Sequence, residues 1–392
     1  MTAESARRFD ALEAQAERIM GVFGGAGYER VAPAILQPAG IFLDRVGEDI
    51  RSRAYVFTDQ DGNELCLRPD LTIPVCRVYL DRHPAADAAA RYSYNGPAFR
   101  YQHGASNPLR PREFRQAGVE NFGTADALAA DIETLSFTFK AMRAAGLARA
   151  HLKIGDIGLF RGLLAAAPMP ERWRGRLMAA FWRGDALRRV LAQLSAPSKT
   201  LVDGALAPLM DGIDLAYPEK AQTAVAEYLE TQGVELIGRR TAAEIATRLV
   251  ERKADLAEPP LPQAIAELIT RYLAISAPAP AAIKATKDLA ASTRIDLSGA
   301  IADFEARVAR LSEAGFDPAK AVFSAETGRR FEYYTGFVFE LSVGEDAIPA
   351  PVASGGRYDR LLGALGAAKA TPAVGAAIYT ERLLGAVERG AA

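Results

Sequence analysis

Two strand-like segments joined by a short polar loop constrain the fold of this chain most. The segments are Phe99–Gln102 and Glu113–Phe122, and the loop between them, His103–Arg112, contains a proline. A link this short cannot provide the crossover connection that parallel strands need, so the two strands must pair antiparallel. The chain therefore contains an antiparallel sheet, and the other predicted elements have to be placed around this pair.

The segments before this pair predict one helix, one short strand and one hairpin. Apolar residues repeat at helical spacing over Phe9–Phe23, and two glycines follow. Residues 27–33 form a short strand whose proline belongs at a sheet edge or at a strand end. Tyr55–Thr58 and Glu64–Leu67 flank a polar, glycine-containing turn, which is typical of a β-hairpin.

The sequence pattern changes after a predicted helix over Leu128–Met142 and a strand at Leu152–Ile154. Helical periodicity dominates from about Leu163 to Phe316, with a capping box at Thr241–Glu244 and a connector at Ala277–Pro280. Further strands are expected at Ala321–Ala325, Glu332–Ser342 and Ala373–Ile378, followed by a helix from Thr380. We therefore expect an α/β (α+β) core at 1–162 and 319–392, split by a mainly helical insertion at 163–318.

Composition narrows the function classes. The 47 basic and 48 acidic residues nearly cancel, whereas nucleic-acid binders usually carry a basic excess, so nucleic-acid binding is not expected. Two cysteines and three histidines cannot supply the common zinc frameworks or a disulfide scaffold, and we expect no metal and no cofactor. The start is polar and no apolar run reaches membrane-spanning length, so the expected location is the cytoplasm, away from membranes.

Five strings in one order resemble the catalytic core of the histidyl-tRNA synthetases, a class II aminoacyl-tRNA synthetase family. The strings are Leu67–Thr72, Phe99–Gln102 with Arg112–Gly123, Arg329–Gly336, Ser354–Asp359, and Pro372–Gly375 with Glu381-Arg382. Each string alone is a weak signal, but five in order make a chance match very improbable. The resemblance covers about Phe9–Ile157 and Ala321–Leu384, and it implies a class II synthetase-like, mostly antiparallel sheet flanked by helices.

The same resemblance implies a pocket for histidine or a similar small ligand. Its side chains are Asp70, Thr72, Arg100, Gln116, Glu120, Arg329, Tyr333 and Tyr334. The aspartate, the glutamine and the threonine hydroxyl offer acceptors suited to an ammonium group. The two arginines suit a carboxylate or phosphate, and the glutamate with the two tyrosines suits an imidazole ring.

Each of these residues also has a purely structural interpretation. Asp70 is equally suited to cap a helix that begins near Leu71. Glu120 has apolar neighbours on its strand, so it can lie on a solvated face. The adjacent pair Tyr333-Tyr334 would face opposite ways in a strand, so at most one of the two is expected to point into a pocket. For Gly355-Gly356 the structural interpretation is a simple turn with no ligand group nearby.

The departures from the synthetase pattern concern the nucleotide and the tRNA. Gln102 replaces the glutamate of motif two, and Arg330 and Tyr379 stand where that family has glycines. A large side chain does not fit where a backbone approaches closely enough to require glycine, which argues against a synthetase-like ATP pose. Only ten residues follow Arg382, so we expect no anticodon-binding domain and no catalytic residues.

A synthetase-like core without these parts resembles the regulatory subunits of the short-form ATP phosphoribosyltransferases. That resemblance implies a non-catalytic protein that supports the first step of L-histidine biosynthesis together with a separate short-form catalytic subunit. It implies self-association as a dimer within a hetero-octamer, and L-histidine as an effector. The residues leave open whether histidine occupies the synthetase-like pocket or a subunit interface.

Two rival functions remain at this stage. A synthetase-like enzyme would activate histidine with ATP, which predicts ATP–pyrophosphate exchange. A tRNA- or RNA-binding module would use the arginines that interleave with Trp173 and Trp182 in the insertion. The structural alternative for these residues, a solvated helix face with two buried tryptophans, is favoured by the neutral net charge.

Overall fold

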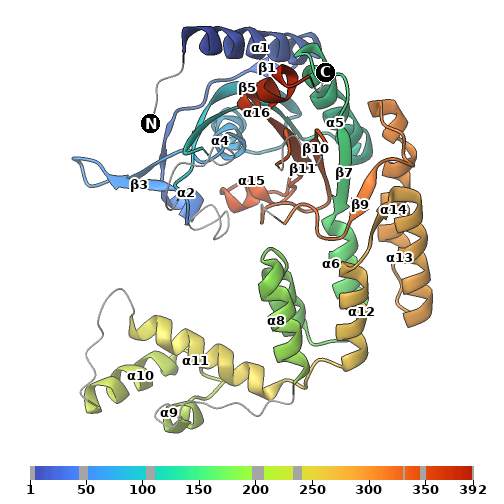
Figure 1. The fold of residues 1–392 in the computed structure, drawn as a ribbon. Coiled ribbons are helices and arrows are strands. Elements are labelled where there is room, and N and C mark those ends of the chain that lie inside the picture. The colour runs from blue at the N-terminus through green and yellow to red at the C-terminus, as the bar shows by residue number, and fades with distance from the viewer. Residues whose placement is uncertain are drawn as a thin grey trace. The chain divides into compact units, whose positions relative to one another are not determined.

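The computed structural model describes residues 5–43, 52–102, 111–196, 207–232, 241–329, 332–344 and 350–390. Most of the predicted loop after Gln102, and Arg330, lie outside these residues. The chain forms two compact units: Met1–Ala166 with Thr270–Ala392, called the sheet unit below, and Ala167–Ile269, called the helical unit. Figure 1 shows the elements of both units.

The sheet unit is built on a large, mostly antiparallel sheet. Among the described residues its strands lie in the order β1 (Glu29–Arg30), β5 (Ala90–Phe99), β6 (Glu113–Phe122), β12 (Ala373–Tyr379), β11 (Ala353–Arg357), β10 (Phe337–Ser342), β7 (His151–Asp156), β9 (Val322–Ser324) and β8 (Ser276–Pro278). Only the β1·β5 and β7·β9 pairs in this sheet are parallel. The predicted mixed α/β class with an antiparallel sheet is confirmed.

The antiparallel pair that opened the sequence argument is present, with one shifted boundary. β6 matches its predicted range, and it pairs with β5 from Phe99 opposite Glu113 to Ala90 opposite Phe122. The first strand was expected at Phe99–Gln102, but it runs over Ala90–Phe99 and ends where that segment begins. Its sequence contains Gly96 and Pro97, which weaken a strand pattern read from sequence.

A second, small sheet of three strands, β2 (Leu36–Pro38), β4 (Glu64–Leu67) and β3 (Tyr55–Thr58), contains the predicted hairpin with its predicted bounds. Gly62 takes φ +84°, which a side-chain-bearing residue adopts only at a cost. The Asp59 carboxylate accepts the backbone N–H groups of Asp61 at 3.0 Å and Asn63 at 2.8 Å, and so closes the turn.

Helices cover both faces of the large sheet. α1 (Ala6–Gly25), α5 (Ala127–Ala144) and α16 (Thr380–Glu388) pack along one face, as Figure 1 shows. α4 (Thr72–Arg82) packs on the other face, where the Tyr79 ring stacks on Phe122 with centroids 4.5 Å apart. α1 buries its predicted apolar residues except Phe9, whose side chain is 49% exposed near the helix start.

The glycine pair Gly355-Gly356 lies inside strand β11, not in a turn. A Cβ at Gly355 would come within 2.6 Å of the Phe339 ring, and one at Gly356 within 2.9 Å of the Tyr334 ring. Glycine is therefore required because aromatic rings from other segments press on this strand. The remaining short elements of the sheet unit are α2 (Gly40–Leu43), α6 (Ile157–Ala166), α13 (Ala279–Thr293), α14 (Ser298–Ala309), η1 (Leu311–Ala314) and α15 (Leu361–Ala364).

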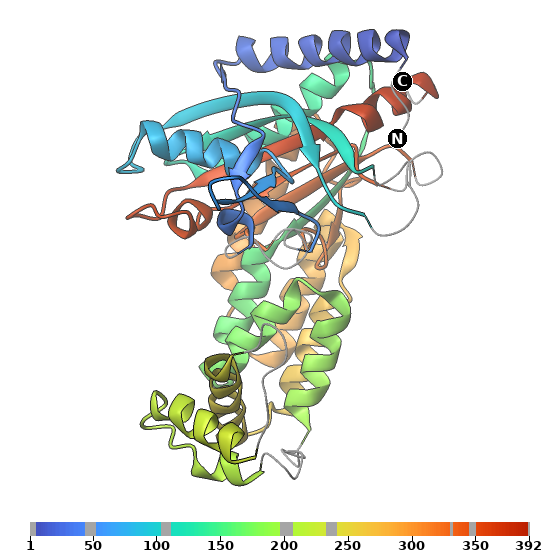
Figure 2. The same cartoon turned by 90° about the vertical axis from the view of Figure 1, so that its left-hand side faces the viewer.

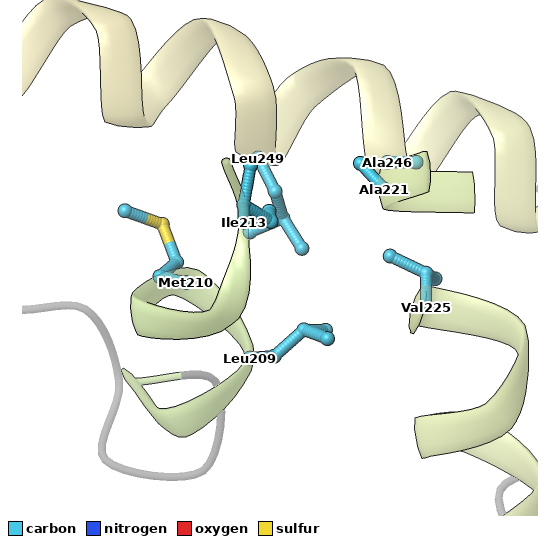
Figure 3. Close-up of a cluster of buried hydrophobic side chains, with 7 residues drawn as sticks. All are labelled: Leu209, Met210, Ile213, Ala221, Val225, Ala246 and Leu249. Carbon is cyan, nitrogen blue, oxygen red and sulfur yellow. The ribbon is translucent and has the colours of Figure 1, made fainter. Parts of the chain in front are cut away.

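The helical unit has its own small apolar core. Its helices are α7 (Glu171–Phe181), α8 (Gly184–Ser195), α9 (Ala207–Gly212), α10 (Lys220–Thr231) and α11 (Ala242–Ala257), and α12 (Gln263–Leu273) crosses its boundary. The buried residues of Figure 3 come from α9, α10, α11 and the segment after α9: Leu209, Met210, Ile213, Ala221, Val225, Ala246 and Leu249. The predicted capping box is confirmed, because Thr241 and Glu244 each accept the other's backbone N–H.

The helical unit ends near Ile269, about fifty residues before the expected boundary at 318. Residues from Thr270 onward belong to the sheet unit because β8 pairs with β9 and α14 packs against α5. Ala277–Pro280, expected as a connector, forms the end of β8 and the start of α13. Figure 2 shows the same elements from a second direction. Over the described ranges, no helix has the length and apolar character needed to span a bilayer.

Candidate functional site

A small cavity lies on the face of the large sheet that carries α4. Its volume is about 20 Å³, enough for about one water-sized sphere. Five of the eight predicted pocket residues line it: Asp70, Thr72, Gln116, Tyr333 and Tyr334. The resemblance therefore identified side chains from three distant segments that the fold brings together.

Asp70 has the structural role that was its alternative, and its role at a ligand stays a prediction. It precedes α4, and its Oδ1 accepts the Ile73 backbone N–H at 3.3 Å, as a helix-capping residue does. Its Oδ2 is buried and has no hydrogen-bond partner. Burial raises the pKa of the Asp70 carboxyl to about 6, and the positive charge of Arg100 partly offsets this rise. One oxygen thus holds the helix while the other remains available at the cavity.

Gln116 supplies a second unsatisfied acceptor beside the cavity. It lies on β6 opposite Tyr379 of β12, and only 2% of its surface is exposed. Its Oε1 is buried without a hydrogen-bond partner. Unpaired buried acceptors are rare because each costs about 1–3 kcal/mol, so two in one cavity require an explanation. Together they match a ligand group that carries several N–H donors.

Glu120 lies on the same strand, and its carboxylate is fully buried. The Tyr94 hydroxyl donates to its Oε1 at 3.2 Å, and the Tyr358 hydroxyl donates to its Oε2. Burial raises the pKa of Glu120 to about 8, although hydrogen bonds from Tyr358, Thr72 and Tyr94 favour the charged form. The alternative that Glu120 lies on a solvated face is therefore wrong.

The backbone of β12 passes directly over this carboxylate. Gly375 is the register partner of Glu120, and a Cβ there would come within 1.6 Å of Glu120 Oε2. Gly118, two residues before Glu120, would place a Cβ 2.5 Å from the Tyr94 ring. A side chain at either position would collide with these buried groups, so both positions require glycine.

Tyr333 and Tyr334 both line the cavity, although at most one was expected there. They lie in an irregular segment before β10, so the alternation of a strand does not apply to them. Their ring centroids are 5.1 Å apart with planes at 69°, an edge-to-face pair. The Tyr333 ring also makes an edge contact with Tyr358, at 5.9 Å.

Arg100 and Arg329 do not line the cavity, contrary to the expectation that they would bind a carboxylate there. Arg100 Nε donates to the Pro69 carbonyl at 2.8 Å, and its guanidinium lies over the Phe114 ring at 4.8 Å. Arg329 Nη1 donates to Glu326 at 2.9 Å. Sequence reasoning missed Tyr94 and Tyr358, and only Tyr358 had a signal, its place in the Ser354–Asp359 string.

An arginine–aromatic stack occupies one side of the cavity. Tyr379 also lines the cavity, and the centroid of its ring lies 5.8 Å from that of Phe114. The guanidinium group of Arg382 lies 4.1 Å from the centroid of the Tyr379 ring. The guanidinium group of Arg100 lies over the Phe114 ring. Cation–π contacts of this kind hold side chains in place. The large side chain at position 379 is thus buried among packed neighbours.

Trp173 and the arginines at 172, 174 and 176 have partners within the helical unit. Trp173 is 3% exposed, and its indole N–H donates to the Pro259 carbonyl at 2.9 Å. Arg172 and Arg176 both pair with Asp255. A buried indole cannot stack on a base, which weakens the RNA-binding reading. In the described part of the chain, no group of three or more His, Cys, Asp or Glu side chains could hold a metal ion.

Comparisons with known proteins agree with this architecture. The model of the histidyl-tRNA synthetase family matches residues 5–383. Proteins from Brucella canis and Brucella abortus named ATP phosphoribosyltransferase regulatory subunit are 35% identical over 362 residues, covering 91% of this chain and 92% of theirs.

Solved structures show the same fold. An ATP phosphoribosyltransferase regulatory subunit/histidyl-tRNA synthetase from Bacillus halodurans superposes with a TM-score of 0.67 at 20% identity, over 99% of this chain and 81% of that one. A histidyl-tRNA synthetase from Nostoc superposes with a TM-score of 0.62 at 15% identity, over 99% and 74%. The chain belongs to the histidyl-tRNA synthetase family and, within it, to the ATP phosphoribosyltransferase regulatory subunits.

Proposed function

We propose that this chain is a non-catalytic regulatory subunit of ATP phosphoribosyltransferase. It acts with a separate, short-form catalytic subunit in the first step of L-histidine biosynthesis and makes that step responsive to histidine. Identity of 35% over nearly the full length of proteins with that name supports the assignment. The Tyr379 ring, packed between Phe114 and Arg382, supports the non-catalytic part, because it lines the cavity at a position where the synthetases have a glycine near the nucleotide.

The ligand of the cavity is, in this proposal, L-histidine. The observation that carries it is the pair of unpartnered buried acceptors, Asp70 Oδ2 and Gln116 Oε1, beside the buried Glu120 carboxyl. An amino-acid ammonium offers three N–H donors, and the two acceptors with the Thr72 hydroxyl suit it. Glu120 then suits an imidazole N–H, and the two adjacent tyrosine rings, at 333 and 334, offer apolar faces for the ring.

Binding requires the cavity to enlarge. About 20 Å³ holds a water molecule but not an amino acid. At least one lining side chain must therefore move when the ligand enters. A ligand that stabilises the enlarged form shifts the population toward it, which is the physical requirement for a sensor.

Calorimetric titration of the isolated chain with L-histidine tests the pocket. Asp70→Asn should weaken binding about tenfold, because a charge-assisted hydrogen bond contributes about 1.5–3 kcal/mol. Asp81→Asn is the matched control, since Asp81 is exposed near the other end of α4 and should not affect binding. Equal affinities for the two variants would exclude the pocket and leave a subunit interface as the histidine site.

Assembly is the second part of the proposal. The chain forms a dimer that joins the catalytic subunit in a hetero-octamer, and the exposed apolar side chains on the small sheet, Leu36, Val56 and Phe57, support self-association. Native mass spectrometry of the chain alone, and mixed with a short-form catalytic subunit, measures both steps. A chain that stays monomeric and never joins the catalytic subunit would contradict this part.

The main rival is a synthetase-like enzyme that activates histidine. ATP–pyrophosphate exchange dependent on histidine distinguishes the two readings. The regulatory proposal predicts no exchange above background. Measurable exchange that requires L-histidine would favour the rival.

A further inference from the structure

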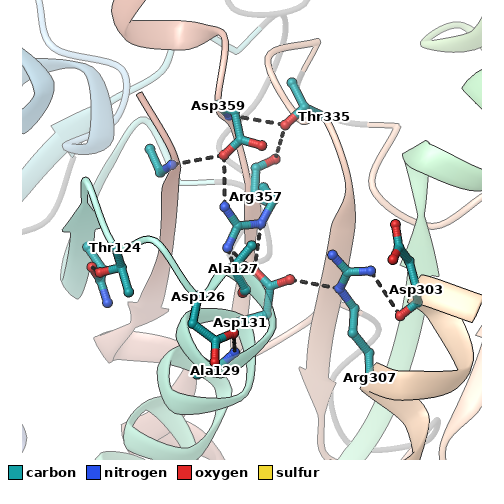
Figure 4. A network of polar contacts seen from close by, with 12 residues as sticks. Thr124, Asp126, Ala127, Ala129, Asp131, Asp303, Arg307, Thr335, Arg357 and Asp359 are labelled. Atoms are coloured by element: carbon teal, nitrogen blue, oxygen red, sulfur yellow. Dashed lines mark hydrogen bonds and ion pairs between the residues drawn. The ribbon is translucent and has the colours of Figure 1, made fainter. Parts of the chain in front are cut away.

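A buried ion network lies on the opposite face of the large sheet from the cavity. Its centre is Asp131 of α5, whose side chain is fully buried. Asp131 Oδ1 accepts the Arg357 Nε–H at 2.9 Å, and Oδ2 accepts the Arg307 Nε–H at 2.8 Å. Figure 4 shows the two guanidinium groups on either side of the carboxylate. One carboxylate therefore joins strand β11 to helix α14.

The network continues into two of the segments that carry pocket tyrosines. Arg357 Nη1 donates to Asp359 Oδ1 at 2.8 Å, and the Asp359 N–H donates to Thr335 Oγ1 at 3.1 Å. The Thr335 N–H in turn donates to the Arg357 carbonyl at 2.7 Å. Thr335 directly follows Tyr334, so residues 333–335 and 357–359 are held to each other by these bonds.

Adjacent residues at the end of β11 connect the network to the cavity. Successive side chains of a strand point to opposite faces. Arg357 binds Asp131 on one face of the sheet, while the next residue, Tyr358, lines the cavity on the other face and donates from its hydroxyl to the buried Glu120. Arg357 and Tyr358 are joined by one peptide bond, so the network and the cavity meet at the end of β11.

The outer end of the network is α14. Arg307 donates from Nη1 to the Asp303 carbonyl at 3.0 Å, and the same nitrogen lies 3.6 Å from Asp156 Oδ2. Its side chain is 11% exposed, so solvent screens these charges little. Removing one partner of a buried ion pair lowers the stability of the folded protein by several kcal/mol. Such a network therefore favours a few discrete arrangements of its side chains over a continuous range of positions.

We propose that this network couples occupancy of the cavity to the packing of α14, with Asp131 and Arg307 as positioning residues that never touch the ligand. The inference rests on the proposed histidine pocket for the identity of the ligand, but not for the coupling itself. Breaking the contact between Arg307 and Asp131 then weakens ligand binding in the pocket, and ligand binding in the pocket stabilises the packing of α14. Both effects are the same coupling free energy seen from two sites.

The first test follows α14 by hydrogen–deuterium exchange in the full chain. L-Histidine should slow exchange of the α14 amides in the wild type. Arg307→Gln should abolish this slowing and weaken histidine binding about fivefold, the low end of typical coupling. Arg310→Gln is the matched control, because Arg310 follows α14 and pairs with the exposed Glu313 outside the network. Arg307→Lys replaces the glutamine variant if that variant does not fold.

The second test needs no ligand, so it separates this inference from the proposed function. Tyr358→Phe removes the hydroxyl that donates to Glu120. As a single substitution it should accelerate amide exchange in α14 at least threefold, whereas adding it to the Arg307→Lys variant should cause no further acceleration. Independent distant sites would give a double variant whose acceleration equals the product of the two single accelerations, within about twofold. That result would overturn the coupling whether or not histidine binds. Failure of histidine to bind, with the Tyr358–Arg307 dependence intact, would overturn only the proposed ligand.

Discussion

Replacing Glu120 by glutamine tests the electrostatics of the buried carboxyl group that accepts from Tyr358, a residue lining the cavity. The carboxyl group is fully buried between the Tyr94 and Tyr358 hydroxyls, and the Gly375 backbone passes over it. Glutamine has the same size and shape, and its amide oxygen can accept one of the same hydrogen bonds. The substitution therefore removes the ionisable group with little change in packing.

The magnitude follows from the raised pKa of Glu120. Burial raises this pKa from 4.5 to about 8, a difference of about 3.5. Each pKa unit corresponds to about 1.4 kcal/mol, so the ionised carboxylate costs the folded state roughly 5 kcal/mol relative to the protonated form. Between pH 4.5 and 8 the folded chain binds more protons at Glu120 than the unfolded chain. The contribution of Glu120 to the free energy of unfolding therefore falls as the pH rises through this window.

Chemical denaturation followed by circular dichroism, from pH 5 to pH 9, measures the effect. The wild type should lose roughly 4 kcal/mol relative to Glu120→Gln across this range, because pH 5 already lies above the unfolded pKa of 4.5 and the glutamine variant lacks the titration. Glu113→Gln, at the exposed start of the same strand, is the control and should stay within about 0.5 kcal/mol of the wild type at every pH. Subtracting the free energy of unfolding of Glu120→Gln from that of the wild type at each pH cancels the contributions of all other titrating groups.

Two results would refute this reasoning. A difference between wild type and Glu120→Gln that stays within about 1 kcal/mol from pH 5 to pH 9 would show that burial does not dominate. A wild type that gains stability relative to the variant as the pH rises would show that the tyrosine and threonine donors outweigh desolvation.

Three further predictions concern packing and the ion network. Gly375→Ala should destabilise the chain by about 3 kcal/mol or more, seen as a lower melting temperature, because its Cβ would collide with Glu120 Oε2; an unchanged melting temperature would contradict the close approach. Asp131→Ala should cost about 3–5 kcal/mol in chemical denaturation because it leaves two buried arginines without their shared partner, and a cost below about 1 kcal/mol would contradict this. Leu249→Ala should cost the helical unit about 2–5 kcal/mol and speed its amide exchange while the sheet unit is unaffected; equal acceleration in both units would contradict their separate cores.

Local rules predicted the elements whose constraints lie close together in the sequence. The short connection after Phe99 requires antiparallel pairing, and the turn at Asp59–Asn63 determines the register of its hairpin. The capping box at Thr241 needs only four residues to be recognised. These features depend on geometry that neighbouring residues set by themselves.

The features that sequence reasoning missed depend on distant segments. Gly355-Gly356 is typical of a turn, but it lies in a strand that pairs with β10 and β12 from distant parts of the chain. Arg329 was expected at a ligand carboxylate, yet it pairs with Glu326 three residues earlier. The resemblance named five of the residues that line the cavity, but not Tyr358, because a hydrogen bond between residues 120 and 358 leaves no local pattern.

The boundary of the helical unit shows the same limit. α13 and α14 have the periodicity of the helices before them, so the insertion was expected to continue to residue 318. Their place in the sheet unit depends on long-range contacts such as the ion pair between Arg307 and Asp131. Helical periodicity identifies a helix but does not say which core it packs against.

The most direct test of the regulatory assignment is a phosphoribosyl-transfer assay with a short-form ATP phosphoribosyltransferase catalytic subunit, alone and mixed with this chain, with and without L-histidine. The account predicts that the chain raises the rate of transfer from 5-phosphoribosyl diphosphate to ATP and makes the mixture sensitive to inhibition by histidine. A rate and a histidine response that are the same with and without the chain would contradict it.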